Sequence, residues 1–561
     1  MIVRNLKEML VPLNRKFPKL VPIARSEIFH FFLLCFISLM QCKAVFHFRP
    51  DLDPWDESWY MRKEFIFPDI FFTSLNIGPL YTGWYNLIYK FAENLPQLYY
   101  LSSLIISFAI GPIFYLFLRR SRFTVLQGLS AFFLILFYPP LVTVTRFVNN
   151  FGVAFVLLGL LFVTFESRRI SKLWLAAIVF FFATYVRPEL SIAFLICFGV
   201  YSFYFFRKLL GRQTSWYESF KFFLLSGLLF IQILGAKTEV YVGNITHSLY
   251  IFRYYSEARK GGGPSYFNWI YGNPTTLGQA ISNNPLEFLN HVAFSLKAFL
   301  PRFWDAFSSF AAHEDIGFYL ILILILFLNL LSKRRIQADK TEPYWKDQIL
   351  FLSLMTVPVF LSGVIFGTNT RYLIFPMICI IAFIPKILLS SEIRKSWVAA
   401  FLLLVVLIQM ISPAKFNQVS YKIFQTEGIG KQSCGGVTEA ITKLIKVQKQ
   451  FKVDKTKAIL ADSLIFMYTG NNYRPNCGTI EECFSGVNDE DLTNGNIESH
   501  LLPFDAVVFD RRDNSVRLMS QKKKAWLNRF FAEPEKYGFK PLYMNCADTA
   551  LLVRTSILDQ R

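Results

Sequence analysis

The chain has 561 residues, of which 53% are apolar and only 17% charged, and its formal net charge is +20. A soluble protein of this length carries about 25% charged residues, so the composition excludes an ordinary soluble protein. Residues 414–561 hold 21 Lys and Arg against 17 Asp and Glu, which is four of the twenty excess charges. The rest of the basic excess lies with the apolar part of the chain, largely at the ends of apolar segments, so no nucleic-acid partner is predicted.

Apolar runs long enough to cross about 30 Å of hydrocarbon recur through the first 413 residues. They predict a polytopic α-helical membrane protein with about eleven transmembrane helices. We expect these helices near residues 28–47, 98–118, 123–140, 150–166, 173–187, 189–206, 219–236, 317–332, 348–367, 372–390 and 396–413. Arg187-Pro188-Glu189 interrupts the run 173–206 and predicts a tight turn between two helices, the alternative being a single kinked helix.

Short loops rich in Lys and Arg stay in the cytoplasm, and this rule orients the predicted helices. Basic clusters alternate along the chain, in the N-terminal segment, at 119–122, 168–169, 207–208, 333–335 and 394–395. Alternation places the loops 48–96 and 237–316 and the tail 414–561 on the external side. The predicted domains are therefore a transmembrane domain, 1–413, and a small external α/β domain, 414–561.

The cysteines divide between the two predicted domains. Those in the apolar spans act as small hydrophobic residues, namely Cys35, Cys42, Cys197 and Cys379. Those in the external tail permit two disulfides in three pairings, namely Cys434, Cys477, Cys483 and Cys546. Only five residues separate Cys477 from Cys483, so we expect this local disulfide together with Cys434–Cys546. A zinc site or free thiols are the alternatives, although no close Cys-x-x-Cys supports zinc.

The tail contains short apolar runs suited to buried strands at 457–461, 504–509 and 550–553. Positions 437–452 and 519–532 predict amphipathic helices. The tail has no glycine-rich phosphate loop, no HExxH and no nucleophile elbow. We therefore look for the chemistry on the external face of the transmembrane domain.

The first external loop carries an acidic and aromatic segment, Asp51 to Tyr60, directly after the first predicted membrane helix. Charges beside hydrocarbon are costly, and such clusters usually face a cavity, an ion or a substrate. Within it Asp56-Glu57-Ser58-Trp59-Tyr60 has the form Asp-Glu-x-x-Tyr. About twenty residues later comes Gly78-Pro79-Leu80-Tyr81 in a predicted helical stretch, Ile77–Phe91, and Thr370-Arg371-Tyr372-Leu373-Ile374-Phe375-Pro376 opens a late helix.

These three elements in this order resemble the GT-C glycosyltransferases that use polyprenyl-phosphate sugars, among them the protein O-mannosyltransferases and the lipid A aminoarabinose transferases. The many helices followed by an external C-terminal domain are similar to theirs too. The aminoarabinose branch usually has Arg inside its Asp-Glu motif, where this chain has Trp59. The resemblance is therefore to a general member of the superfamily.

The resemblance implies an external active site in which a carboxylate deprotonates the acceptor hydroxyl as the sugar leaves its lipid phosphate. It assigns this general base to Asp56, with Glu57 orienting the acceptor or tuning Asp56. It implies that Tyr60, Tyr81 and Tyr372 contact substrate. The alternative is that Asp56 and Glu57 only cap the amphipathic helix that follows them.

A phosphate leaving group calls for cations, and the planar fork of arginine suits phosphate oxygens. The external candidates for this role are Arg146, Arg187, Arg253, Arg259, Lys260 and Arg371. Ordinary anchoring to lipid phosphates is the alternative for each. Asp53, Asp56 and Glu57 supply the oxygen ligands that Mg²⁺ or Mn²⁺ prefers, which leaves a divalent-cation cofactor open.

The predicted function is transfer of a sugar from a polyprenyl-phosphate donor to a lipid, glycan or protein acceptor on the outer face of a membrane. The predicted setting is a bacterial inner membrane, with the tail in the periplasm and membrane lipids as further partners. A transporter or lipid flippase is one alternative, although the chain shows no internal repeat. A non-catalytic envelope assembly protein is another.

Overall fold

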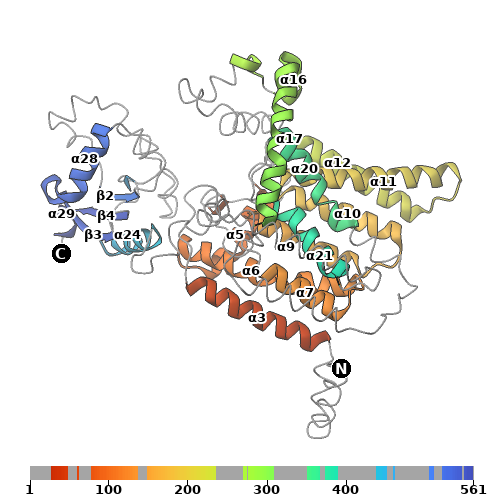
Figure 1. Cartoon of the computed structure of the whole chain (residues 1–561), viewed down its shortest axis with the longest axis horizontal. Coiled ribbons are helices and arrows are strands. Elements are labelled where there is room, and N and C mark those ends of the chain that lie inside the picture. The colour runs from red at the N-terminus through yellow and green to blue at the C-terminus, as the bar shows by residue number, and fades with distance from the viewer. Residues whose placement is uncertain are drawn as a thin grey trace, which may run out of the picture. The chain divides into compact units, whose positions relative to one another are not determined.

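A computed structural model describes residues 27–47, 60–61, 78–136, 148–235, 269–274, 276–308, 350–366, 373–388, 437–451, 459–460, 505–510, 521–545 and 549–559. These residues form a mostly helical protein with a small sheet near the C-terminus (Figure 1). They fall into two compact units. The helical unit holds the described residues of 27–45, 78–81 and 104–388, and the C-terminal unit holds those of 46–64, 82–103 and 437–559.

Long helices dominate the region in which transmembrane segments are predicted. They are α3 (Glu27–His47), α5 (Pro79–Ile88), α6 (Leu95–Arg120), α7 (Val125–Leu136), α9 (Val148–Val163), α10 (Arg169–Thr184), α11 (Ser191–Leu210), α12 (Trp216–Gly235), α16 (Leu277–Asn283), α17 (Pro285–Ser308), α20 (Thr356–Phe366) and α21 (Ile374–Leu388). Seven of the predicted segments thus coincide with a helix to within a few residues, namely with α3, α6, α7, α9, α10, α11 and α12. Residues 350–353 are also helical, before a turn at 354–355 and α20, and α21 covers most of the segment predicted at 372–390. The segments predicted at 317–332 and 396–413 lie outside the described residues.

The turn predicted at Arg187-Pro188-Glu189 is present. α10 ends at Thr184, and Pro188 begins a short 3-10 helix, η4 (Pro188–Leu190), that leads into α11. Arg187 is extended, with φ −140° and ψ 111°, as the residue before a proline usually is. Because α10 and α11 pack along each other, the alternative of a single kinked helix is wrong.

Small residues bring the helices close together. A Cβ placed on Gly111 of α6 would lie 2.8 Å from the Phe132 ring of α7, and one on Gly159 of α9 would lie 2.5 Å from Val179 of α10. Only glycine therefore permits these two approaches. Beside the first of them, a buried apolar cluster joins α3, α6 and α7 through Leu34, Tyr115, Phe132 and Leu136.

The helical unit has two ends with different chemistry. At one of them, called here the basic end, α6 meets α9, α21 meets the α6–α7 junction, and α10 meets α12. The contacts are Arg120 over the Phe165 ring, Lys386 over the Phe123 ring, and the Lys221 ammonium donating to Ser171 Oγ at 3.1 Å. Three of the predicted basic clusters, at 119–122, 168–169 and 207–208, lie at helix ends of this kind. The other predicted basic clusters, in the N-terminal segment and at 333–335 and 394–395, lie outside the described residues.

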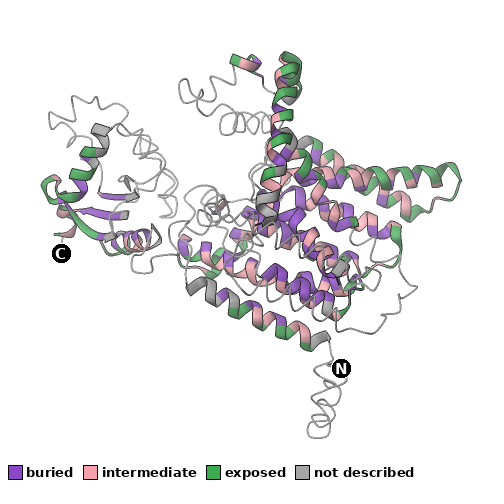
Figure 2. Ribbon diagram, viewed as in Figure 1, coloured by how far each residue is buried: buried purple, intermediate pink, exposed green. Residues whose placement is uncertain are grey.

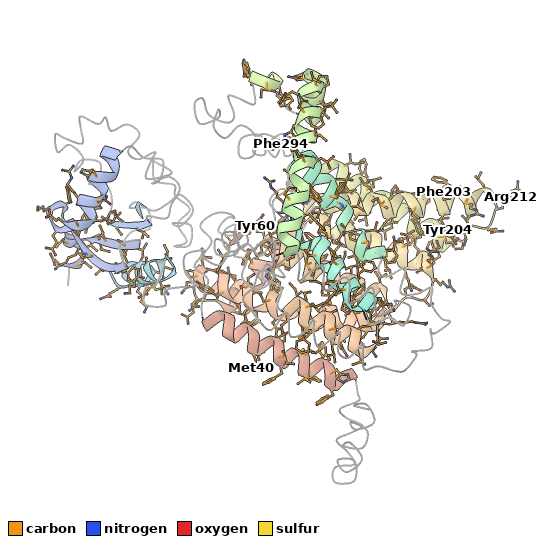
Figure 3. The ribbon with its side chains drawn as sticks, viewed as in Figure 1. Met40, Tyr60, Phe203, Tyr204, Arg212 and Phe294 are labelled. Carbon is orange, nitrogen blue, oxygen red and sulfur yellow. The ribbon has the colours of Figure 1, made fainter. Side chains whose placement is uncertain are left out.

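Large apolar side chains are exposed along several helices of the helical unit. The α11–α12 hairpin, which has Arg212 at its tip and Phe203 and Tyr204 further back on α11 (Figure 3), is green over much of its length in Figure 2, where green marks exposed residues. Phe203 is 72% exposed, Phe223 69% and Phe230 61%. Such a surface is rare on a soluble monomer. By length and composition, two helices of the described residues can cross a membrane, Leu95–Arg120 and Pro188–Leu210, and further apolar helices are shorter.

The C-terminal unit contains a four-stranded sheet in the order β1-β2-β4-β3. Its strands are β1 (Ile459–Leu460), β2 (Ala506–Asp510), β3 (Phe539–Asn545) and β4 (Thr549–Arg554). β1 and β2 are parallel, whereas the other two pairs are antiparallel. Two helices predicted in the tail are present as α24 (Val437–Phe451) and α28 (Gln521–Ala532), and α24 contacts β2, β3 and β4. The predicted boundary at 413 lies outside the described residues.

Three of the longer described elements, each of seven residues or more, have no counterpart in the sequence prediction. β3 is an edge strand whose register shifts between Pro541 and Tyr543, and proline within an apolar run argues against a strand except at such an edge. α16 and α17 lie within the predicted external loop 237–316. α17 was missed because its apolar residues occupy one face of a helix that also carries Glu287, His291, Lys297 and Arg302.

Candidate functional site

The candidate site lies at the other end of the helical unit, called here the Arg187 end. It is formed by the starts of α5, α9 and α21 and by the turn between α10 and α11. These four segments are far apart in the sequence, and three of them carry motifs that the sequence analysis selected. Figure 3 draws the side chains of the described residues as sticks.

The Gly-Pro-Leu-Tyr motif begins α5. Gly78 has a positive φ of 53°, a conformation that favours glycine, and Pro79 occupies the first position of the helix. The Leu80 N–H donates to the Tyr185 carbonyl at 3.0 Å, which ties this motif to the end of α10. Tyr81 is completely buried, with its ring centroid 5.1 Å from that of Phe151 in α9. Contact of Tyr81 with substrate stays a prediction.

Arg187 and Glu189 form an ion pair in the α10–α11 turn. Arg187 Nη2 donates to Glu189 Oε1 at 2.7 Å, and the two side chains are 12% and 23% exposed. The guanidinium was predicted as a phosphate-binding cation, and the structure supplies it with a carboxylate partner two residues away. Arg187 thus enters any binding site as part of a pair whose net charge is close to zero.

α9 brings a polar start to this end. Asn149 and Asn150, 2% and 1% exposed, are buried in its first turn. A Cβ on Gly152 would lie 3.2 Å from Phe375 Cζ and 3.6 Å from Arg187 Cγ. Gly152 therefore marks the point where α9, α21 and the Arg187 turn meet.

Asn149, Asn150 and Glu189 were not predicted from the sequence as site residues, although Glu189 was placed in a turn. A signal was present, since an Asn-Asn pair opening an apolar helix just after Arg146 is an unusual place for two amides. A buried carboxylate needs hydrogen-bonding partners, which makes Glu189 a candidate for recognising a polar ligand.

The late Arg-Tyr motif leads into the same end. α21 starts at Ile374, and Leu373, Ile374 and Phe375 are buried. Arg371 and Tyr372, which precede Leu373 in the chain, lie outside the described residues. The described part of this motif therefore meets the Gly-Pro-Leu-Tyr motif and the Arg187 turn through α9.

The remaining predicted site residues are not placed together with these. Tyr60 is helical and half-buried in the C-terminal unit, next to the buried Met61. Predicted residues that lie outside the described residues are Asp53, Asp56, Glu57, Arg146, Arg253, Arg259, Lys260 and the four tail cysteines, Cys434, Cys477, Cys483 and Cys546.

Among the described residues, no group of three or more His, Cys, Asp or Glu side chains is arranged to hold a metal. The carboxylates proposed as metal ligands are not among those residues, so a divalent-cation site stays a prediction. The described cysteines, Cys35, Cys42, Cys197 and Cys379, are free thiols, and three of them are buried. This agrees with their predicted role as small apolar residues.

The basic end shows a contrasting use of acidic residues. Glu166 Oε1 accepts hydrogen bonds from the backbone N–H groups of Arg168 and Ser167, at 3.0 and 2.8 Å. The bond from Arg168, then that from Ser167, and the nearby positive charges together hold the pKa of Glu166 below its usual range. The carboxylate therefore stays ionised at the start of α10, where the helix dipole favours a negative charge.

Comparison of the chain with protein-family models and with curated proteins finds no match. The geometry of the Arg187 end and the motifs that lead into it are therefore the basis for inferring a function.

Proposed function

We propose that this protein is a polytopic membrane glycosyltransferase that moves a sugar from a polyprenyl-phosphate donor to an acceptor. The observation that carries the proposal is the junction at Gly152. Three motifs selected from the sequence, each from a different part of the chain, lead to the same end of the helical unit. A helical bundle needs no such convergence for its stability alone.

A membrane setting is supported by the surface of the helices. Exposed phenylalanines such as Phe32, Phe162 and Phe223 would each place a large apolar ring in water. Burying such a ring in hydrocarbon is favourable by about 2 to 3 kcal/mol. The aromatic residues Trp216 and Tyr217, exposed at the start of α12 beside basic side chains, have the composition of a membrane–water interface.

The orientation follows from the two ends. The basic end collects Arg and Lys from several helices, so we place it in the cytoplasm and the Arg187 end outside. An external site meets a lipid-linked sugar at the headgroup level of the bilayer. This assignment keeps the chemistry at the membrane surface, where Asp56 and Glu57 are expected from the sequence.

In the proposed reaction Asp56 accepts the proton of the acceptor hydroxyl as the sugar's anomeric carbon leaves the lipid phosphate. Arg371 neutralises the charge that remains on the phosphate. Glu57 holds the acceptor or raises the proton affinity of Asp56. The bond formed joins the acceptor oxygen to the sugar, and the bond broken joins the sugar to the phosphate oxygen.

The test is sugar transfer in vitro from a defined polyprenyl-phosphate donor by the full-length protein. Asp56→Asn keeps the shape of the side chain but removes the proton acceptor, so turnover should fall by about a hundredfold to ten-thousandfold. Arg371→Ala should weaken donor binding as well as turnover. Transfer at the wild-type rate by Asp56→Asn would show that Asp56 only caps a helix.

A further inference from the structure

One oxygen of the Glu189 carboxylate is buried without a hydrogen bond. Glu189 Oε1 accepts from Arg187 at 2.7 Å, whereas Glu189 Oε2 has no hydrogen-bonding partner in the described part of the chain. A buried acceptor left unsatisfied destabilises a fold, and more so when it carries charge. Such an atom therefore needs an explanation other than stability.

Helix capping does not provide that explanation. Glu189 lies in η4 just before α11, where a carboxylate often bonds to backbone N–H groups. Among the described residues, Glu189 Oε2 accepts no backbone N–H, and neither Arg187 nor Leu190, the N-cap residues of η4 and α11, makes a side-chain cap hydrogen bond. The carboxylate is instead held by Arg187 through Oε1, which leaves Oε2 buried and without a donor within the described ranges.

A second helix, α9, packs against the Arg187 turn. Gly152 lies 3.6 Å, at its Cβ position, from Arg187 Cγ. Asn149 precedes Gly152 by three residues, so both lie on the same face of α9. The buried amides of Asn149 and Asn150 thus start the helix that packs against the Arg187 turn.

We propose that Glu189 and the first turn of α9 bind the sugar ring of the lipid-linked donor, with Glu189 Oε2 accepting a hydrogen bond from a sugar hydroxyl. Carboxylate and amide groups together can accept from and donate to neighbouring hydroxyls. In this arrangement Arg187 is a positioning residue, since its guanidinium holds Glu189 in place. The assignment rests on the proposed function, because it names the part of the donor that this end recognises.

The test compares a lipid phosphate without a sugar with the same lipid phosphate carrying one of three sugars. Full-length protein in detergent micelles is titrated with farnesyl phosphate and with farnesyl phosphates carrying mannose, glucose or galactose. We expect the wild type to bind at least one sugar-bearing lipid more tightly than farnesyl phosphate. Glu189→Gln should weaken binding of that lipid by about tenfold, the lower part of the range for a hydrogen bond to a charged group. Binding of farnesyl phosphate should not change.

Glu218→Gln is the matched control, because Glu218 also pairs with a basic side chain but lies at the basic end. It should leave both affinities unchanged. Equal weakening of both ligands by Glu189→Gln, or no change in either, would overturn the assignment while leaving the proposed function in place. Failure of the wild type to bind any of these lipids would overturn the proposed function and the assignment together.

Discussion

The two ends of the helical unit each contain an ion pair at a turn between helices. The pairs differ in how many oxygens of the carboxylate accept a hydrogen bond. At the basic end Glu218 accepts from Lys208 Nζ at 2.5 Å, and its other oxygen accepts from the Ser215 N–H at 3.4 Å. The Glu218 N–H donates back to Ser215 Oγ, which forms a capping box at the start of α12. Every charged atom of this carboxylate has a structural partner.

At the Arg187 end the corresponding carboxylate is only half satisfied. Glu189 has one oxygen on Arg187 and the other without a donor, although its side chain is about as exposed as that of Glu218, at 23% against 20%. The two carboxylates are about equally buried, but only Glu218 has a hydrogen bond on both oxygens. We therefore interpret the Lys208–Glu218 pair as stabilising its turn and the Arg187–Glu189 pair as able to bind a ligand. The difference is the strongest reason to place recognition at the Arg187 end.

The largest effect on stability should come from removing the positively charged side chain of the Arg187–Glu189 pair, and a smaller one from the same change in the Lys208–Glu218 pair. Arg187→Ala leaves Glu189 partly buried with neither oxygen bonded, and we expect it to destabilise the protein by about 1 to 3 kcal/mol, less than for a fully buried pair. Lys208→Ala should cost about 1 kcal/mol or less, since Glu218 keeps its capping box. Thermal unfolding of both variants in the same detergent measures the difference. Equal losses would remove the contrast between the two ends.

A comparable effect is expected from filling the junction at Gly152. Gly152→Leu would push the side chain against Phe375 and Arg187, and we expect a loss of about 1 to 3 kcal/mol together with reduced sugar transfer. Gly199→Leu in α11 is the control. A Cβ there meets nothing within 4 Å, and replacing glycine in a helix favours folding by up to about 1 kcal/mol. A tolerated Gly152→Leu variant with full activity would show that the junction does not hold the site.

The sequence predicted the helices well where apolar runs were bounded by strong local signals. Pro188 marked the α10–α11 turn, and Arg119-Arg120 marked the end of α6. The Gly-Pro-Leu-Tyr helix was found for the same reason, because Gly78 and Pro79 favour a helix start. α17 was not predicted, since hydropathy along the chain averages out an amphipathic helix.

Site residues were predicted only where a family motif or a charged residue type marked them. Arg187 was selected as a cation, but its neutralisation by Glu189 depends on side-chain geometry in the turn. Asn149 and Asn150 became candidates only because α9 packs against the Arg187 turn, and the local sequence does not predict that packing. Pairing and burial of this kind are properties of the folded chain.

The smallest effect should come from the basic end, at Glu166. Because the folded state holds the pKa of Glu166 below its usual value near 4.5, folding is favoured by the ionised carboxylate above that pH. This contribution should be lost as the pH falls below about 4.5 and through the lowered folded-state value. Glu166→Gln should lower stability at pH 7 by about 0.5 kcal/mol, near the lower limit for a helix cap. Apparent melting temperatures of wild type and variant between pH 7 and pH 3 should therefore converge on acidification. A constant gap across this range would mean that Glu166 acts through packing, and not through its charge.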